Sequence, residues 1–487
     1  MRYVRSVPLS VLVVWITTLT VSAAAPDRAP PAGRKPNIVL LLADDLTYEA
    51  VRALGNQQVD TPNIDRLARE GVTFSHAYNQ GSWSPAVCVA SRHMLVTGRF
   101  LWHARAASER AEAERRAGRF WPEYLRRAGY ATYMTGKWHI RAAAAAAFDH
   151  VRHVRPGMPR QTEAGYHRPI EGKPDVWQPW DTSRGGYYKG GRHWSEVLAD
   201  DAIAFLDDAT NGNRPFFLYL AFNAPHDPRQ SPREYVERYR LDEIRIPDNF
   251  LAEYPMNEAI GCGRKLRDEM LAPFPRTEFA IRVHRREYYA IITHMDEQIG
   301  RILDAIDRTG AAENTYVFFT SDHGLAVGSH GLVGKQSLFD HSLRVPLMVR
   351  GPALPAGRRF DGAVYLQDVM PTSLEVAGVE CPEHVQFRSL LPIVRGERAA
   401  NYTSLYGAYL ALQRSVIEGD YKLILYPAIR KTLLFYQEHD PLEMHDLAGD
   451  PAQQATLRRL FKRLIALQKE TGDTLDLVKT YPRLVGG

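Results

Sequence analysis

The sequence has few cysteines: Cys88, Cys262 and Cys381 are the only three among its 487 residues. Three thiols cannot all pair within one chain, so complete disulfide pairing is excluded. An exported protein is free to form disulfides, and the sequence leaves open whether Cys262 and Cys381 form one. The odd count indicates that one cysteine has another role.

The sequence also lacks an excess of charge of one sign. It has 61 basic and 56 acidic residues, which gives a net charge of +5. Two positive charges, Arg2 and Arg5, lie in the predicted leader, and removing both from +5 leaves +3 on the mature chain. No long basic run is present. This pattern argues against nucleic acid as the main partner.

Only one long apolar run is present, at residues 7–21, after a short basic stretch. Small residues at 22–25 are typical of a cleavage site, so residues 1–25 are predicted to be a signal peptide. An uncleaved anchor is the alternative, but the run is slightly short for a span. No cysteine follows it for lipid attachment. We therefore expect a secreted or periplasmic protein with no stable membrane insertion after cleavage.

After a proline-rich linker at residues 26–35, the chain alternates between strand and helix patterns. Continuous apolar runs are typical of strands that are covered on both faces of a parallel sheet. Such runs lie at residues 37–43, 130–134, 216–222 and 315–320. Helical patterns lie at residues 61–70, 120–128, 195–207 and 286–308. This alternation predicts an α/β fold with a mostly parallel sheet.

The pattern changes in the last third of the chain. A helix pattern at residues 367–378 ends at a glycine, and shorter strands and one charged helix follow it. These later elements are predicted at residues 404–406, 415–418, 422–426 and 451–470. We predict a catalytic α/β domain at residues 36–380 and a smaller α+β domain at residues 381–487.

Two polar, poorly periodic segments at residues 150–195 and 240–280 are expected to be long loops, which often carry function. Aromatic side chains in the first loop could stack on a sugar or pin the loop onto the core, and both interpretations stay open. These aromatics are Trp177, Trp180, Tyr187, Tyr188 and Trp194. An alanine tract at residues 142–147 predicts a short helix or a spacer.

Ionisable residues follow each of the four strand candidates directly. In open α/β sheets, ligands bind beyond the carboxyl ends of the strands, so these side chains are expected to converge on one site. The residues are Asp44 and Asp45, then Lys137 and His139, then His226, and finally Asp322 and His323. Four such clusters in one sheet are hard to explain by the solvation of loops.

The chemistry of these residues indicates a metal beside an anion. Carboxylates and an imidazole suit a hard divalent cation such as calcium or magnesium. The cationic or proton-carrying groups suit a tetrahedral sulfate or phosphate ester. These groups are Lys137, His139, His226 and Lys335. Taken singly, each residue could instead be a helix cap, a turn or a surface charge.

Cys88 follows a proline-bearing loop and precedes a helix-like run. A nucleophile at the start of a helix has free N–H groups and the helix dipole directed at its anionic substrate. Arg92 would lie one turn along the same face. A buried structural cysteine is the alternative for Cys88 alone.

Together these residues resemble the type I sulfatases of the alkaline phosphatase superfamily. Cys88-Val-Ala-Ser-Arg92 is similar to the motif that directs conversion of cysteine to formylglycine, and Leu-Val-Thr-Gly-Arg99 matches its extension. The other family segments occur in order over residues 35–470. They are residues 37–45, Gly-Lys137-Trp-His139, Ala-Pro-His226-Asp227, Thr-Ser-Asp322-His323-Gly and Gly-Lys335. The resemblance implies an alkaline-phosphatase-like sheet sandwiched by helices.

The resemblance also implies a mechanism. Formylglycine at position 88, made by a transient maturation enzyme, would be hydrated and would attack sulfur. One Ca²⁺ would be held by Asp44, Asp45, Asp322, His323 and the modified Cys88. Arg92 would fix the hydrate, and Lys137, Lys335 and His226 would neutralise the sulfate and protonate the leaving alcohol. His139 would remove the second hydroxyl proton, so that sulfate is eliminated.

Two positions depart from the commonest family pattern. Ala90 stands where proline is commoner, which leaves the efficiency of maturation open. Asp322-His323 stands where many members have Asp-Asn, as in the iduronate- and choline-sulfatase-like branches. Neither departure identifies a substrate.

The predicted function is release of sulfate from a sulfated saccharide, either a polysaccharide or its oligosaccharides. A phosphodiester or phosphonate monoester hydrolase on the same scaffold is the alternative. A non-catalytic protein that binds sulfated glycans is a third interpretation, but such a protein would show an eroded site. No erosion is visible in the sequence.

Overall fold

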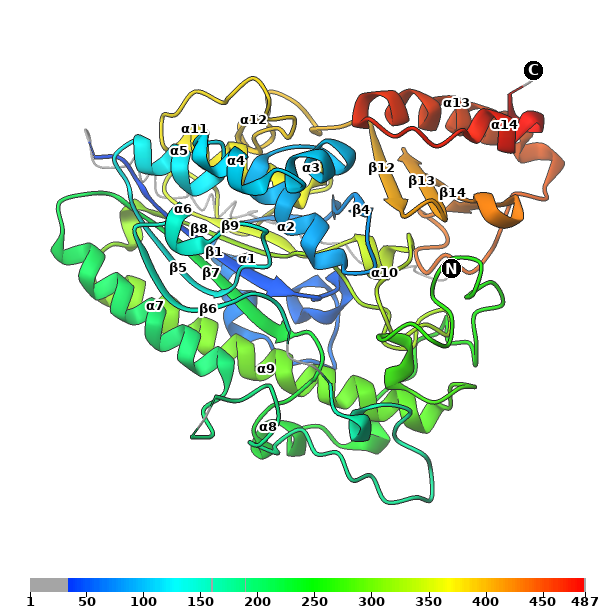
Figure 1. Cartoon of the computed structure of the whole chain (residues 1–487), viewed down its shortest axis with the longest axis horizontal. Coiled ribbons are helices and arrows are strands. Elements are labelled where there is room, and N and C mark those ends of the chain that lie inside the picture. The colour runs from blue at the N-terminus through cyan, green and yellow to red at the C-terminus, as the bar shows by residue number, and fades with distance from the viewer. Residues whose placement is uncertain (1–33, 159–160, 189, 486–487) are drawn as a thin grey trace, which may run out of the picture.

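The structure is a computed structural model that describes residues 34–158, 161–188 and 190–485. The predicted signal peptide and most of the predicted linker lie outside these residues. The described residues form three sheets, and the two larger ones lie side by side, each with helices packed on it (Figure 1). Within the described ranges, no helix combines the length and the apolar character that a membrane span needs.

The four predicted strands are confirmed and form the centre of an eight-stranded sheet. The strand order of this sheet is β10-β2-β9-β8-β1-β7-β5-β6. β1, β7, β5 and β8 are parallel, so their carboxyl ends meet at one edge. Apart from half-buried Asn37, all their residues are buried, as continuous apolar runs predict. Their bounds are β1 Asn37–Asp44, β5 Ala131–Lys137, β7 Phe216–Pro225 and β8 Thr315–Ser321.

Four further strands of this sheet escaped the sequence patterns. β9 runs antiparallel to β8 and β2, so the sheet is mixed at one side. Three of the strands have three or four residues, too few for a periodic signal. β6 lies at the sheet edge with no fully buried residue, which corrects the expectation of an irregular loop from residue 150. The strands are β2 Val72–Phe74, β6 His150–Arg155, β9 Leu347–Arg350 and β10 Arg358–Phe360.

Helices cover both faces of the sheet, and the four predicted helices are confirmed. Side chains of alternate β1 residues divide the core: Val39 and Leu41 pack with α1, α7 and α9, while Ile38 and Leu40 pack with α2, α5 and α11. Figure 1 shows α7 and α9 below the sheet and α5 above it. The helices are α1 Pro62–Glu70, α2 Val87–Thr97, α5 Trp121–Arg127, α7 Trp194–Asn211, α9 Glu278–Arg308 and α11 Val369–Val376.

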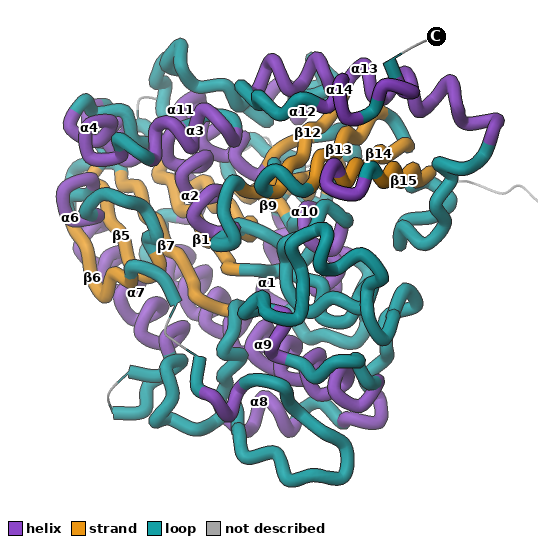
Figure 2. Tube along the Cα trace, turned by 45° about the vertical axis from the view of Figure 1, so that its right-hand side comes forward, coloured by secondary structure: helices purple, strands orange, loops and turns teal. Residues whose placement is uncertain are grey.

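The second sheet confirms a smaller α+β part near the C-terminus. β12 Ser404–Tyr409, β13 Gln413–Glu418 and β14 Tyr421–Tyr426 form an antiparallel meander with β15 Lys431–Tyr436, which the sequence patterns had not indicated. α13 Gln454–Thr471 packs on this sheet. β4 Gly81–Ser82, from the N-terminal part, adds an edge strand parallel to β12. The two sheets are therefore tied together (Figure 2), and the boundary at residue 380 stays a prediction.

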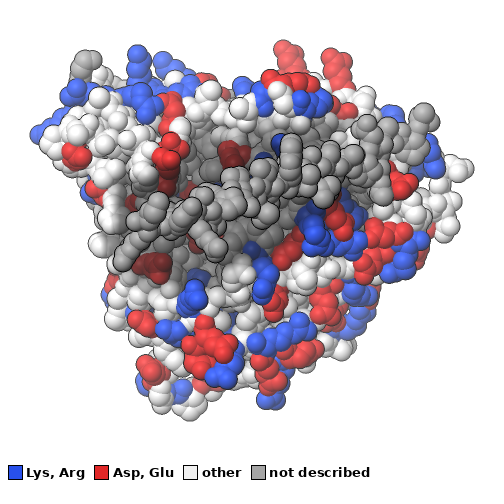
Figure 3. Space-filling model, turned by 180° about the vertical axis from the view of Figure 1, so that it is seen from behind, with Lys and Arg blue, Asp and Glu red and all other residues white. Residues whose placement is uncertain are grey.

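Short elements complete the described chain. α6 spans the predicted alanine tract, so the short-helix alternative is confirmed. On the face shown in Figure 3, acidic and basic side chains are interspersed over the lower half. The remaining elements are β3 Ala77–Tyr78, β11 Val364–Tyr365, α3 Leu101–Ser108, α4 Ala111–Arg116, α6 Ala144–Ala147, α8 Arg233–Glu237, α10 Asp340–Leu343, α12 Leu391–Val394 and α14 Leu477–Thr480.

Candidate active site

The carboxyl ends of the central strands bring most of the predicted residues together. Asp44 ends β1 and Lys137 ends β5, while His226 and Asp322 directly follow β7 and β8. Gly136 permits the close approach of β5 to β7, because a Cβ there would lie 1.9 Å from the carbonyl oxygen of Ala221. The sheet therefore delivers ionisable side chains from four strands to one place.

Cys88 is the second residue of α2 and is 2% exposed. Its Sγ lies 3.7 Å from Asp45 Oδ1 and 3.5 Å from Lys335 Nζ. Burial, together with the charges of Asp322 and Asp44, raises the pKa of the Cys88 thiol well above its ordinary value. Since the thiolate is the nucleophilic form, an unmodified Cys88 is a poor nucleophile here.

Two buried lysines face two buried aspartates beside Cys88. Lys137 Nζ donates to Asp44 Oδ2 at 2.6 Å, and Lys335 Nζ donates to Asp45 Oδ2. Burial alone would raise the pKa of Asp44, but Lys137, with smaller effects of other cations, holds it well below its ordinary range. Both lysines also have raised pKa values, because the carboxylates outweigh the effect of burial. Asp44 and both lysines are therefore charged.

Arg92 is completely buried behind these groups. Its Nε donates to Asp322 Oδ2 at 2.8 Å, and its Nη1 donates to the carbonyl oxygen of Lys137 at 2.6 Å. The other oxygen of Asp322 accepts from the backbone N–H of Asp45 at 3.2 Å. Burial and the charge of Asp44 raise the pKa of Asp322 to about 6. Arg92 thus fixes the ends of three strands relative to α2.

His226 faces Asp45, with its Nε2 3.4 Å from Asp45 Oδ2. Its other nitrogen, Nδ1, lies 2.7 Å from the carbonyl oxygen of Asp227 and 3.1 Å from Asp227 Oδ1. Both of these oxygens are acceptors, so Nδ1 carries a proton and Nε2 is the nitrogen that faces the site.

His139, which is half-buried, and His323, which is buried, lie close to the same groups. His139 Nδ1 has no hydrogen-bond partner, and burial together with Lys137 lowers the pKa of His139 to about 2. His323 Nδ1 donates to the carbonyl oxygen of Gly324 at 3.1 Å, and burial lowers the pKa of His323 to about 4. Both imidazoles are therefore neutral near pH 7, so each keeps one nitrogen lone pair free of a proton.

The donor set fits a divalent cation. One ligand atom from each of Asp44, Asp45, Cys88 and His226 lies within 4.8 Å of the others. Asp44 Oδ1 is buried and makes no hydrogen bond, which is costly unless another group binds it. Carboxylate oxygens are the ligands that calcium prefers. Asp322 adjoins this group, because it accepts from the backbone N–H of Asp45. Its role as a ligand, like that of His323, stays a prediction.

A cavity of about 270 Å³ opens beside Cys88 and includes residues that the sequence patterns did not identify. Arg267 and Asp268 come from the predicted loop at residues 240–280, where nothing distinguished them from other polar residues. Only the length of that loop was a signal. The lining residues are Pro85, Ala86, Cys88, His139, Met158, His226, Leu266, Arg267, Asp268, Lys335 and Gln336.

None of the five loop aromatics lines this cavity. Trp177 is 2% exposed, and the guanidinium of Arg168 lies 4.5 Å from its ring centre. Trp180 is covered in the same way by Arg233, at 5.3 Å. These contacts favour the interpretation that the aromatics pin the loop, and the structure gives no support for stacking on a sugar at the cavity.

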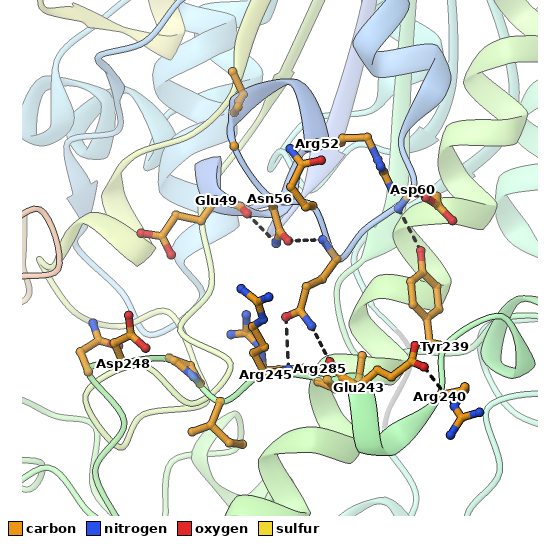
Figure 4. A pocket seen from close by; sticks show the side chains of 18 of the residues that line it. Glu49, Arg52, Asn56, Asp60, Tyr239, Arg240, Glu243, Arg245, Asp248 and Arg285 are labelled. Atoms are coloured by element: carbon orange, nitrogen blue, oxygen red, sulfur yellow. Dashed lines mark hydrogen bonds and ion pairs between the residues drawn. The ribbon is translucent and has the colours of Figure 1, made fainter.

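A larger hollow of about 780 Å³ lies elsewhere and contains none of the predicted site residues (Figure 4). Ion pairs occupy much of its charged lining. Arg52 pairs with Asp60, and Arg240 pairs with Glu243 at 3.2 Å. Positive and negative side chains are mixed around this hollow. It therefore lacks the cluster of buried catalytic groups that surrounds Cys88.

All three cysteines lie in the described residues, and none forms a disulfide. Cys262 is buried, and its thiol donates to the carbonyl oxygen of Gln336 at 3.1 Å, whereas Cys381 is exposed. The open question about their pairing is therefore answered, and Cys88 is left free for chemistry.

The fold and the site together define a hydrolase of the alkaline phosphatase superfamily. A mostly parallel sheet carries charged residues from four strand ends to one buried nucleophile position. The chain belongs to the sulfatase family, because the sequence profile of that family matches residues 36–379. A second profile, described as N-sulphoglucosamine sulphohydrolase, C-terminal, matches residues 328–470. The protein is therefore a sulfuric ester hydrolase.

Relatives match over nearly the whole chain. A sulfatase from Formosa agariphila is 28% identical, covering 92% of this chain and 89% of the relative. A choline-sulfatase from Rhizobium meliloti is 29% identical, covering 87% and 85%. An N-acetylglucosamine-6-O-sulfatase from Bacteroides thetaiotaomicron is 25% identical, covering 96% and 91%.

Solved structures show the same fold. One is a complex with its substrate D-glucosamine-2-N,6-O-disulfate, with a TM-score of 0.70 and 24% identity over 91% of this chain and 99% of the other. Another is the phosphonate monoester hydrolase of Agrobacterium radiobacter, with a TM-score of 0.69 and 21% identity over 90% and 96%. At these identities the likeness establishes the fold alone.

Proposed function

We propose that this protein is a formylglycine- and calcium-dependent sulfatase that releases inorganic sulfate from a sulfated saccharide, either a polysaccharide or its oligosaccharides. One observation carries the proposal: a buried Cys88 lies beside Lys335 and Asp45, in a cavity lined also by His139 and His226. Relatives with N-acetylglucosamine-6-O-sulfatase and ulvan-active sulfatase names support a saccharide substrate.

Cys88 would be modified by a separate maturation enzyme. Its thiol is buried with a raised pKa, so it is unsuited to attack sulfur directly. Conversion to formylglycine would supply an aldehyde whose hydrate carries the attacking hydroxyl. The export that residues 1–25 predict would place the enzyme where sulfated polymers are found, in the periplasm or outside the cell.

Asp44, Asp45, Asp322 and His323, with the modified residue 88, would hold Ca²⁺, which supplies positive charge for the sulfate oxygens when bound. The chain adds Lys137 and Lys335, whose charges lie against Asp44 and Asp45. These two ammonium groups would bind sulfate oxygens and stabilise the charge that develops on them. Arg92 would hold Asp322 and the start of α2 in place.

The two histidines would move protons. His226 holds its Nδ1 proton against Asp227, so its Nε2 is the atom that would protonate the leaving alcohol. His139 has an unpartnered Nδ1 and a pKa lowered to about 2 by burial and Lys137. It would therefore be neutral. A bound sulfate would offset the charge of Lys137, and His139 would then accept the proton whose removal expels sulfate from residue 88.

The competing function is hydrolysis of phosphodiesters or phosphonate monoesters. A 27% identical relative is a multifunctional alkaline phosphatase superfamily protein from Trinickia caryophylli, and a phosphonate monoester hydrolase shares the fold. The test is kcat/KM of one purified preparation on an aryl sulfate, an aryl phosphodiester and an aryl phosphonate monoester. We expect the sulfate to be preferred by about 100-fold or more, a difference of about 2.7 kcal/mol in the barrier. A preference for either phosphorus ester would overturn the proposal.

A further inference from the structure

Two charged side chains on the cavity wall have no part in the proposed chemistry. Arg267 and Asp268 lie on the segment that leads into a short helix, Glu269–Leu271, and both line the cavity. Arg267 is bonded to Asp227, the neighbour of His226. If His226 protonates the leaving alcohol, Arg267 and Asp268 lie beside the sugar atoms that neighbour the ester oxygen.

Arg267 is held rigidly, but one of its nitrogens is unused. Its Nη2 donates to both oxygens of Asp227 at 2.7 and 2.6 Å, and its Nε donates to Asp268 Oδ1 at 3.0 Å. Its Nη1 has no hydrogen-bond or ion-pair partner among the described residues. The side chain is 38% exposed despite these bonds. A fixed donor therefore remains available at the cavity.

Asp268 supplies an acceptor beside this donor. The residue is 6% exposed, and its Oδ2 accepts from Gln336 Nε2 at 2.6 Å. Burial would raise the pKa of Asp268, but Lys335 and then Arg267 lower it below its ordinary value, so the group is ionised. A carboxylate offers about four lone pairs, and these two bonds use only part of that capacity.

The charge of this wall selects the kind of group that it can bind. Asp227 and Asp268 are negative and Arg267 is positive, so the trio carries one net negative charge, and Lys335 nearby is already paired with Asp45. A second sulfate or carboxylate would meet repulsion there. A neutral hydroxyl can accept from Arg267 and donate to Asp268 at the same time.

We propose that Arg267 and Asp268 form a subsite for a free sugar hydroxyl next to the sulfate ester, with Arg267 donating to the hydroxyl and Asp268 accepting from it. This subsite rests on the proposed sulfatase function and narrows its substrate to saccharides that keep a hydroxyl unsulfated beside the ester. Met158 and Leu266 line the same cavity and can contact the carbon face of the ring. The volume of about 270 Å³ is slightly below the usual ~300–1,000 Å³ of ligand pockets and suits one sugar unit.

The test is a double-mutant cycle in which one change removes a hydroxyl from the substrate and the other replaces a side chain of the subsite. Glucose 3-sulfate and galactose 4-sulfate would each be compared with analogues that lack one hydroxyl next to the ester, and an aryl sulfate would serve as a reference without hydroxyls. For wild-type enzyme, removal of the recognised hydroxyl is expected to lower kcat/KM roughly 10- to 100-fold. In the Arg267→Gln and Asp268→Ala variants, removal of the same hydroxyl is expected to lower kcat/KM by less than about 3-fold. A general loss of activity lowers kcat/KM for both substrates equally, so it cancels from the ratio between the sugar and its deoxy analogue.

Arg264→Gln is the matched control. Arg264 lies in the same loop, is 57% exposed and pairs with Glu253 at 2.6 Å, and it does not line the cavity. This variant should keep the wild-type ratio between each sugar and its deoxy analogue. A disulfated sugar that carries sulfate in place of the recognised hydroxyl should be a poorer substrate than the monosulfate.

The outcomes separate the subsite from the proposed function. Unchanged ratios in both variants, or a preference for the disulfated sugar, would overturn the subsite alone. Turnover of the aryl sulfate without turnover of either sugar sulfate would also overturn it. Failure of a matured preparation on every sulfate ester would contradict the proposed function itself.

Discussion

Two buried clusters of lysine and carboxylate occur among the described residues, and only one of them lies at the cavity. The first is the active-site cluster, in which Lys137 and Lys335 face Asp44 and Asp45. The second, here called the intersheet cluster, consists of Lys422 on β14 with Asp340 on α10 and Glu443. The lysines of both clusters are almost completely buried, so burial does not distinguish them.

The clusters differ in how fully their polar atoms are bonded. Each carboxylate oxygen of the intersheet cluster has a close partner. Asp340 accepts from Lys422, Gln437 and Tyr78. Glu443 Oε2 accepts from the backbone N–H of Asp340, and Glu443 Oε1, which makes no hydrogen bond, is ion-paired with Lys422 Nζ at 2.6 Å. In the active-site cluster, Asp44 Oδ1 makes no hydrogen bond, and neither does Arg92 Nη2, 3.6 Å away.

The difference indicates different roles. A buried cluster whose charges are all closely paired specifies how two parts of a fold are joined, and here it joins the second sheet to the segment that follows Lys335. A buried cluster with unpartnered atoms is costly on its own and gains stability when a ligand binds. Mutations should therefore affect activity at one cluster and stability at the other.

The largest effect is expected at residue 88. Cys88→Ala removes the position of the proposed nucleophile, so kcat/KM on an aryl sulfate should fall by about 10⁴-fold or more. The melting temperature should change by no more than about 3 °C, because one small buried side chain is lost. Cys262→Ala, at a cysteine outside the cavity, is the control and should keep most activity. If Cys88→Ala kept its activity, Cys88 could not be the position of the nucleophile.

The next effect is a loss of stability at the intersheet cluster. Lys422→Met leaves Asp340 and Glu443 buried without their cation, so the free energy of unfolding should fall by about 3–5 kcal/mol. Lys431→Met on the neighbouring β15 is the control, because Lys431 is 39% exposed and pairs with Asp446 at 2.8 Å. That variant should lose no more than about 1 kcal/mol. Urea denaturation measures both, and equal losses would contradict the distinction between the sites.

A smaller effect should follow from metal at the active-site cluster. Calcium at about 100 times its dissociation constant should stabilise the chelated protein by about 2.7 kcal/mol, measured as a rise in melting temperature. Asp44→Asn should abolish this rise. Lys422→Met should show the same rise, although its melting temperature without calcium is lower than that of the wild-type protein. A rise that survives in Asp44→Asn would place the calcium elsewhere.

The smallest effect is a dependence of stability on pH. Burial, with an added contribution from Asp340, raises the pKa of Glu443 from 4.5 to about 7. The folded state therefore holds this proton more tightly than the unfolded state. The resulting stability is complete below about pH 4.5 and is lost as the pH rises toward 7. Glu443→Gln should reduce this slope by about 1 kcal/mol per pH unit. An unchanged slope would assign the pH dependence to other groups.

Much of the scaffold could be predicted from the sequence because the central strands are buried on both faces. Residues 37–43 and 315–320 are continuous apolar runs, and the ionisable residues directly after them lie at the common strand edge. β6 was missed because an edge strand has no continuous apolar run. β9 and β10 are too short to show a period.

The site was predictable where chemistry follows a strand and not where it follows a loop. Asp44, Lys137 and His226 were identified by their position after strands, and Lys335 owed its place mainly to its resemblance to a family segment. Arg267 could not be found in this way, because its role depends on contact with Asp227, 40 residues earlier in the chain. No local pattern records such a contact.

The most direct test of the central claim is peptide mass spectrometry of residue 88 in active enzyme, together with the rate of sulfate release from the same preparation. The proposed function predicts formylglycine at this position, with specific activity proportional to the converted fraction across preparations that differ in maturation. A fully active preparation whose residue 88 is entirely an unmodified thiol would contradict the account.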